Sequence, residues 1–213
     1  MQVVLQKFAQ NHLLMPYTTN TKHLKNFDLN YFSYFCSIKK ISNMKSTKLI
    51  EKKRPVIGSI IEICIDDKYY TYAQKLANDA GSLVFFDYYD ISRIEDSRIF
   101  NTLKKLFIIT IYDSAFKRSN WKVFNKIEIR EEFKILPLEF IYDKFVDQYK
   151  IYNPNTIEIR KSTKEEIIGL EMCAVWPWYC IEDRIRDHYE GKVCIWVKSM
   201  YGEIFENFQE LYG

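Results

Sequence analysis

The chain has 213 residues, of which 47% are hydrophobic and 16% are aromatic. This length suits one domain, or one domain with an extension, and the apolar content excludes wholesale disorder. No apolar run approaches the roughly 18 residues of a membrane helix, and the N-terminal residues lack the pattern of a signal peptide. We therefore expect a cytoplasmic protein with no membrane partner.

The net charge of +3 conceals two regions of opposite sign. Residues 1–54 contain ten Lys or Arg against two acidic residues, a net charge of +8. Residues 55–213 contain 21 basic and 26 acidic residues, a net charge of −5. We expect the basic leader to be a solvated tail. The larger region has the wrong sign for phosphate contacts, which disfavours a nucleic-acid-binding module.

The same boundary separates two kinds of sequence. Residues 1–54 have no sustained helical or strand period, and 41–54 are rich in Lys and Ser, as linkers are. We expect 1–54 to be a basic N-terminal extension or linker outside the native domain, with Met44 as the biological start, and 55–213 to be a single domain. The alternative is a small helical appendage that packs its aromatic side chains on that domain.

Alternating hydrophobic residues predict a strand over Ser59–Ile65. A polar turn then leads into Tyr69–Gln74, which is rich in strand-favouring aromatics, so the two segments form a predicted hairpin. Further strands are expected over 82–87, 106–113, 121–124, 133–136 and 156–160, with a short helix near 97–105. Residues 56–160 are therefore predicted to form a mostly antiparallel sheet, curled or barrel-like.

The C-terminal third changes to a helical period. Thr163 and Glu166 are spaced as a capping box, and apolar residues follow at helical spacing as far as Val175. Pro177 must interrupt this predicted helix, because proline lacks an N–H and clashes with the preceding turn.

A second helix is expected over Pro177–Glu190, with proline in its first turn and Gly191 as its stop. A late strand over Val193–Lys198 and a short closing helix over 204–211 follow. The predicted fold class is therefore α+β, with the sheet first and a helical segment, a late strand and a short helix after it.

The sequence offers few groups for catalysis. Its five cysteines form no CxxC pair and have apolar neighbours, so buried free thiols are expected. His188 is the only histidine of residues 55–213, which is too few for a histidine metal site. No Gly-rich phosphate loop or nucleophile elbow is present, and Cys180 lies too far from His188 along a helix to contact it. We predict no catalytic residue, no metal site and no cofactor.

Several short motifs occur in an order and spacing that resemble the immunity protein 26 family of bacterial polymorphic-toxin systems. They are Gly58-Ser59-Ile60-Ile61-Glu62-Ile63, Tyr72-Ala73-Gln74, Trp121-Lys122-Val123, Gly169-Leu170-Glu171, Trp176, Ile181-Glu182, Arg184-Ile185, Asp187, Tyr189, Gly191 and Trp196. The resemblance covers about residues 56–199. It departs from the family pattern at Ala73, where a glycine is common.

The resemblance implies a cytoplasmic immunity protein that binds and neutralises a cognate protein toxin in interbacterial competition, without catalysis. The family is also grouped with an organophosphate-hydrolysing enzyme, so a phosphotriesterase-like hydrolase is the alternative. Such hydrolysis usually relies on metal-activated water held by clustered histidines and carboxylates. Because residues 55–213 contain one histidine, we favour the inhibitor over the enzyme.

A binding surface is expected where three large aromatics surround the helix break at Pro177. From residue 165 onward there are ten acidic and four basic residues, a net charge of −6, which suits a basic toxin such as a nuclease. We expect Trp176 to be buried and Trp178 to act as a surface anchor. The candidate toxin-binding residues are Glu171, Trp176, Trp178, Glu182, Asp183 and Asp187. The strand face around Tyr69–Tyr72 is the alternative interface.

Overall fold

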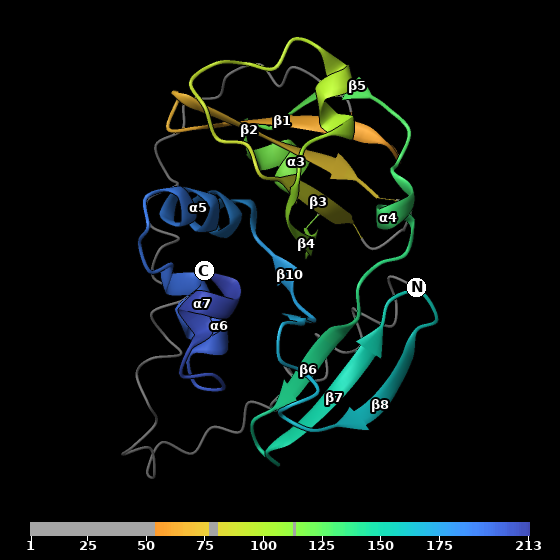
Figure 1. The fold of residues 1–213 in the computed structure, drawn as a ribbon, viewed down its shortest axis with the longest axis vertical. Coiled ribbons are helices and arrows are strands. Elements are labelled where there is room, and N and C mark those ends of the chain that lie inside the picture. Colours follow the sequence, from red (N-terminus) through yellow and green to blue (C-terminus); the bar gives the residue numbers. More distant parts are fainter. Residues whose placement is uncertain (1–53, 77–80, 113) are drawn as a thin grey trace, which may run out of the picture. The chain divides into compact units, whose positions relative to one another are not determined.

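The computed structural model describes residues 54–76, 81–112 and 114–213. The chain divides into two units, Met1–Glu51 and Lys52–Gly213. The predicted N-terminal extension and the proposed start at Met44 therefore lie outside the described residues, apart from Arg54 at the boundary. All elements below belong to the second unit (Figure 1).

The first sheet has six strands in the order β10-β4-β3-β2-β1-β5. Its strands are β1 Ser59–Ile65, β2 Tyr69–Lys75, β3 Ser82–Phe86, β4 Lys105–Ile111, β5 Lys122–Lys126 and β10 Val175–Trp176. All neighbours pair antiparallel except the two-residue β10, which runs parallel to β4. The sheet is therefore mostly antiparallel. The strand at one of its edges, β10, comes from much later in the chain than the other strands.

The predicted hairpin of β1 and β2 is confirmed, with Ile63 opposite Thr71. Its turn places Asp66 and Asp67 at φ angles of 53° and 54°. Two successive residues with positive φ match the right-handed twist of paired strands, and aspartate tolerates that region better than most residues.

Both faces of the first sheet are buried, which explains the nearly continuous apolar sequence of its inner strands. One face of β1 carries Ile61, Ile63 and Ile65 into a core shared with the C-terminal helices. The opposite face carries Ile60 into a second cluster, together with Tyr72 of β2. The alternation read from the sequence therefore separates two cores rather than a core from solvent.

The second sheet has four strands in the order β8-β7-β6-β9. Its strands are β6 Glu139–Asp143, β7 Gln148–Asn153, β8 Glu158–Ser162 and β9 Glu171–Met172. The antiparallel β6, β7 and β8 form a meander, and β9 pairs parallel with β6. The two sheets are separate and are not closed into a barrel.

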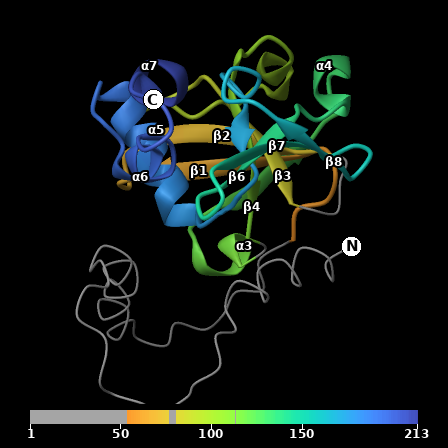
Figure 2. The same cartoon turned by 90° about the horizontal axis from the view of Figure 1, so that it is seen from below.

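Among the described residues the longest helix is α5, over Trp178–Tyr189. The other described helices are η3 Ser97–Asn101, α3 Ala115–Arg118, α4 Glu131–Lys134, α6 Ile195–Tyr201 and α7 Phe208–Tyr212. Figure 2 shows α5, α6 and α7 gathered together beside the strands. Their buried side chains share one core with the first sheet and with Phe140 and Ile151 of the second sheet. The three C-terminal helices thus connect the two sheets.

The predicted α+β class is confirmed, and so are the predicted strands at β3, β4, β5 and β8, the short helix η3, and the helices α5 and α7. Strands β6 and β7 were not predicted. Ile151 lies between Lys150 and Tyr152, but Phe140 is followed by Ile141, so the alternation typical of a strand is incomplete in β6.

The helix predicted from Thr163 to Val175 is wrong. The capping box forms only in part, with the Glu166 N–H donating to Thr163 Oγ1 over 3.4 Å. Turns follow, and Gly169 adopts a φ of +80°. The chain then extends, because β9 and β10 each complete the edge of a sheet. Tertiary pairing overrides the helical spacing here.

Two predicted strands are wrong. Residues 193–198 fall largely in α6, where Val197 and Tyr201 are buried four residues apart, a helical spacing. Late strands do occur, but as β9 and β10. Residues 133–136 contain the last two residues of α4 and the two that follow it, and Phe133 and Leu136 are both buried. In both segments the β-branched or aromatic composition suggested a strand, but no strand forms there.

The turn before β8 contains a strained residue. Ile157 has a φ of +65°, a conformation that costs a β-branched residue about 1–2 kcal/mol. We expect Ile157→Asn to raise the free energy of unfolding by about 1 kcal/mol in urea titrations. The matched control is Ile168→Asn, an equally exposed isoleucine without positive φ, which should give no gain. Equal effects of the two changes would contradict the strain.

Candidate functional site

An aromatic and aliphatic surface lies over α5 and the start of α6. We call it the α5–α6 surface and define it as Trp178, Tyr179, Val193, Ile195 and Trp196. Tyr179 is 47% exposed and Ile195 67% exposed. The Tyr179 ring lies 5.8 Å from the Trp178 ring and 5.9 Å from the Trp196 ring. The three rings therefore form one continuous patch.

The start of α5 sets the direction of these rings. Pro177 occupies the N-cap with an extended φ and ψ, and its carbonyl oxygen accepts the Ile181 N–H over 3.3 Å. The helix buries Cys180, Ile181 and Ile185, so Tyr179 must point away from the core. Trp178 is half-buried and packs against that core. Trp178, the predicted surface anchor, is therefore partly buried, and Tyr179 is exposed beside it.

Asp183 holds the α6 side of the surface in place. Its Oδ2 accepts the indole N–H of Trp196 over 2.8 Å, and its Oδ1 accepts from Arg186 over 2.7 Å. Asp187, one turn further along α5, is half-buried, and this burial raises the pKa of its carboxyl. Asp183 therefore has one partner on α6 and one on its own helix.

Glu182 faces the first sheet rather than the solvent. Its Oε1 accepts the indole N–H of Trp121 over 2.7 Å. Burial raises the pKa of this carboxyl to about 7. Next to it, Arg186 pairs bidentately with Asp66 in the β1–β2 turn, at 2.6 and 2.9 Å. These polar contacts attach α5 to the first sheet.

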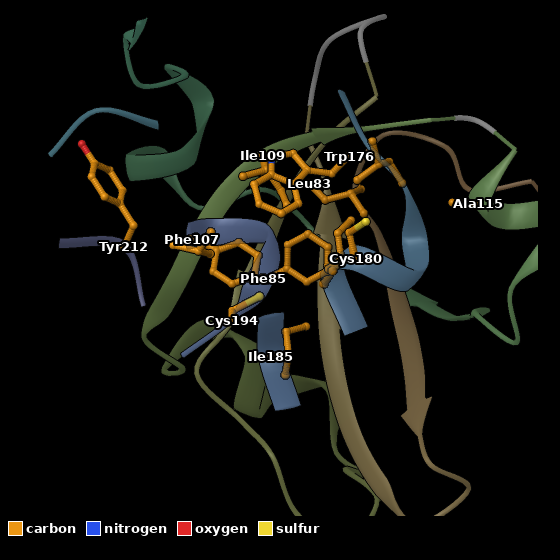
Figure 3. Close-up of a cluster of buried hydrophobic side chains, with 14 of the residues drawn as sticks. Leu83, Phe85, Phe107, Ile109, Ala115, Trp176, Cys180, Ile185, Cys194 and Tyr212 are labelled. Carbon is orange, nitrogen blue, oxygen red and sulfur yellow. The ribbon is translucent and has the colours of Figure 1, made fainter. Parts of the chain in front are cut away.

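Glu171 and Trp176 are the two candidate residues that the structure places inside. Trp176 is 2% exposed, as expected from the sequence, and lies among Leu83 and Ile109 (Figure 3). Glu171 is paired with the buried Arg184, whose Nη2 lies 2.8 Å from Glu171 Oε1. Neither can contribute directly to a binding surface. Of the candidate toxin-binding residues, Trp178, Asp183 and Asp187 therefore remain, while Glu182 contacts Trp121.

Arg184 joins four elements at one point. Besides Glu171 it donates to the Tyr212 carbonyl oxygen over 3.0 Å, and its guanidinium lies 4.3 Å from the Phe107 ring centre. Tyr201 donates its hydroxyl to Glu171 Oε2 over 2.6 Å. The carboxylate and the guanidinium thus satisfy each other within the core.

A second buried glutamate lies beside this pair. Glu139 of β6 stands opposite Glu171 of β9 in the parallel ladder. Burial, opposed by a hydrogen bond from Cys173, raises the pKa of Glu139 to about 7. Burial and the Glu139 charge in turn raise the pKa of the Cys173 thiol. Sequence reasoning missed Glu139, because nothing local distinguishes it from other strand glutamates.

The alternative interface around Tyr69–Tyr72 is occupied within the domain. The Tyr69 ring stacks on Tyr89 at 4.5 Å, and Tyr89 stacks on Tyr189 of α5 at 4.7 Å. Tyr72 is fully buried. These aromatics therefore attach α5 to the sheet and leave the α5–α6 surface as the better candidate.

The described part of the chain contains no group of three or more His, Cys, Asp or Glu arranged to hold a metal ion. His188 is exposed, and its Nδ1 lies 2.9 Å from the Gly213 carbonyl oxygen. Burial raises the pKa of the Cys180 thiol to about 12, so this cysteine stays protonated and unreactive at neutral pH.

Comparison with models of protein families, with curated proteins and with solved structures found no match. Within the described ranges, none of the helices combines the length and apolar character that crossing a bilayer requires.

We predict a large loss of stability when one partner of the Arg184–Glu171 ion pair is removed. Arg184→Met should lower the free energy of unfolding by about 3–5 kcal/mol, because it leaves the Glu171 carboxylate buried and uncompensated. The double variant with Glu171→Leu should recover much of this loss. Arg98→Met is the control, since Arg98 pairs with Asp96 at the surface and its loss should change little. Denaturant titration measures all three, and a mild effect of Arg184→Met would contradict the role of the pair.

The raised pKa values of Glu139 and Glu182 predict a pH dependence of stability. Folding raises both from 4.5 to about 7, so the folded state binds these protons more tightly than the unfolded state. Their contribution is fully present below pH 4.5 and is lost as the pH rises through about 7. We expect the urea midpoint of the protein to fall across this window.

The control for that pH dependence is the double variant Glu139→Gln with Glu182→Gln. Glutamine keeps an oxygen that can accept the Trp121 N–H but does not titrate. The fall in midpoint between acidic and neutral pH should become smaller in this variant. An identical pH profile for the variant and the parent protein would show that neither glutamate titrates with a raised pKa.

Proposed function

We propose that this protein is a cytoplasmic immunity protein, which binds a cognate bacterial toxin through the α5–α6 surface and neutralises it without catalysis. The observation that supports this proposal is the exposed aromatic patch, held on rigid elements and bordered by carboxylates. The resemblance to the immunity protein 26 family supplies the biological class. The patch supplies a place where a partner protein can bind.

The patch has the composition of an interface centre. Tyrosine and tryptophan dominate the energetics of protein interfaces, because they bury large areas with few rotatable bonds. Here Tyr179 stands between two tryptophans, and Val193 and Ile195, which are close to Trp196 in the sequence, are exposed. Contiguous exposed apolar side chains of this kind mark interaction sites more often than scattered ones do.

The patch is also preorganised. Trp196 is fixed by its hydrogen bond to Asp183, and Trp178 is packed on the core. A partner that binds here therefore orders few additional side chains, which lowers the entropic cost of association. The neighbouring helix α5 is itself fixed to the first sheet by Glu182 and Arg186.

The charge around the patch selects the kind of partner. Residues 165–213 have a net charge of −6. Some of these carboxylates are satisfied internally, as Glu171 is, whereas Asp187 is half-buried on α5 and Glu190, at the C-cap of α5, is exposed and pairs with Lys192. An acidic rim accelerates encounter with a basic protein and rejects acidic ones. A basic toxin, such as a nuclease, fits this surface better than an acidic one.

The proposal predicts that the aromatic patch carries the affinity. Tyr179→Ala and Trp178→Ala should each weaken binding of the toxin domain encoded beside this gene by about 2 kcal/mol or more in calorimetry. Phe145→Ala is the matched control, since Phe145 is a 94% exposed aromatic at the β6–β7 turn. Circular dichroism and melting curves of each variant verify the fold.

The carboxylates around the patch are expected to affect the rate of toxin association rather than the affinity of the patch itself. Asp187→Asn should slow association at low salt and change little at high salt, whereas Glu95→Gln, near η3, should have no effect. If both aromatic variants bind as tightly as the parent while Phe145→Ala does not, the interface lies at the β6–β7 turn. If the adjacent toxin domain does not bind at all, the proposed function fails.

A further inference from the structure

Strand β8 forms a free edge of the second sheet (Figure 1). It pairs with β7 on one side, and no other described strand lies on its opposite side. Four of its five residues are exposed, and only Ser162 is half-buried. The outward N–H and C=O groups of such an edge can pair with another strand.

The side chains of β8 alternate in a way that limits how it can pair with itself. Glu158 and Arg160 point to one face of the sheet, and Ile159 and Lys161 point to the other. In an antiparallel pair related by a two-fold axis normal to the sheet, a residue at the axis stands opposite its own copy. The other residues pair symmetrically around it.

The charges favour one register. An axis at Glu158, Arg160 or Lys161 places a charged side chain opposite its own copy, which is unfavourable. An axis at Ile159 places isoleucine opposite isoleucine and Glu158 opposite Arg160 twice. Ile159 is 49% exposed, so this contact would also remove apolar area from water.

We propose that β8 pairs antiparallel with β8 of a second copy of this chain, around a two-fold axis at Ile159. The two second sheets then become one continuous sheet. This inference is independent of the proposed toxin binding, because β8 and the α5–α6 surface belong to different elements.

The existing bonds of β8 are compatible with this pairing. Arg160 Nη1 already lies 2.9 Å from Glu166 Oε2, but a guanidinium has five N–H donors and can bind a second carboxylate. Glu158 accepts the Thr156 hydroxyl over 2.9 Å, which leaves its other oxygen for Arg160 of the second copy. Both side chains are exposed, so neither has to leave a buried partner.

Charge reversal tests the register directly. The full chain should show a concentration-dependent dimer in analytical ultracentrifugation. Glu158→Arg and Arg160→Glu should each be monomeric, because each sets like charges opposite one another. An equimolar mixture of the two variants should form a heterodimer, and the double variant should dimerise alone. Lys117→Glu on α3 is the control and should dimerise like the parent chain.

Several outcomes would overturn the proposal. A parent chain that stays monomeric at every concentration has no such interface. A dimer that survives either single reversal uses another surface. Restoration by the mixture is the decisive result, because a merely misfolded variant cannot be rescued by its complement. Toxin binding should be the same in the monomeric variants, so failure of this inference leaves the proposed function untouched.

Discussion

The ion pair between Arg184 and Glu171 is the contact on which the rest of the domain depends. Arg184 comes from α5, and Glu171 comes from the short edge strand of the second sheet. The same guanidinium lies over Phe107 of the first sheet and donates to the backbone of α7. Two sheets and the C-terminal helices therefore share one buried charge. A buried arginine is tolerable only when its carboxylate and its remaining N–H groups are all satisfied, so these elements have to assemble together.

The dependence of the fold on contacts between distant segments explains which elements could be predicted from the sequence. Strand β1, its turn and β2 follow from alternation and turn residues within a short window, and so does α5 from its proline and glycine limits. The segment between Ser162 and Pro177 does not follow from such a window. Strands β9 and β10 have two residues each, and their conformation is set by β6 and β4, which come much earlier in the chain. No local pattern contains that information.

The candidate surface shows a similar division between local and distant information. The cluster of aromatics around Pro177 was visible in the sequence, and the expected burial of Trp176 is confirmed. The role of the acids was not visible. Asp183 and Glu182 each accept an indole N–H from another element, and Glu171 serves the core. A count of carboxylates therefore overstates the charge available to a partner, because these three carboxylates are engaged within the domain and only Asp183 among them contacts the aromatic surface.

The late position of β9 and β10 also affects synthesis on the ribosome. Both strands pair parallel with partners made long before them, and such non-local pairings form slowly. Until Glu171, Trp176 and Arg184 have been synthesised, β4 and β6 each have a partner on one side only. The apolar faces of both sheets also lack the helices that cover them. A nascent chain that lacks this segment would therefore expose unpaired strand edges and apolar surface to chaperones, and could not form the folded domain. The time between the synthesis of β4 and β6 and the synthesis of β9, β10 and α5 therefore governs how long these surfaces are exposed to aggregation.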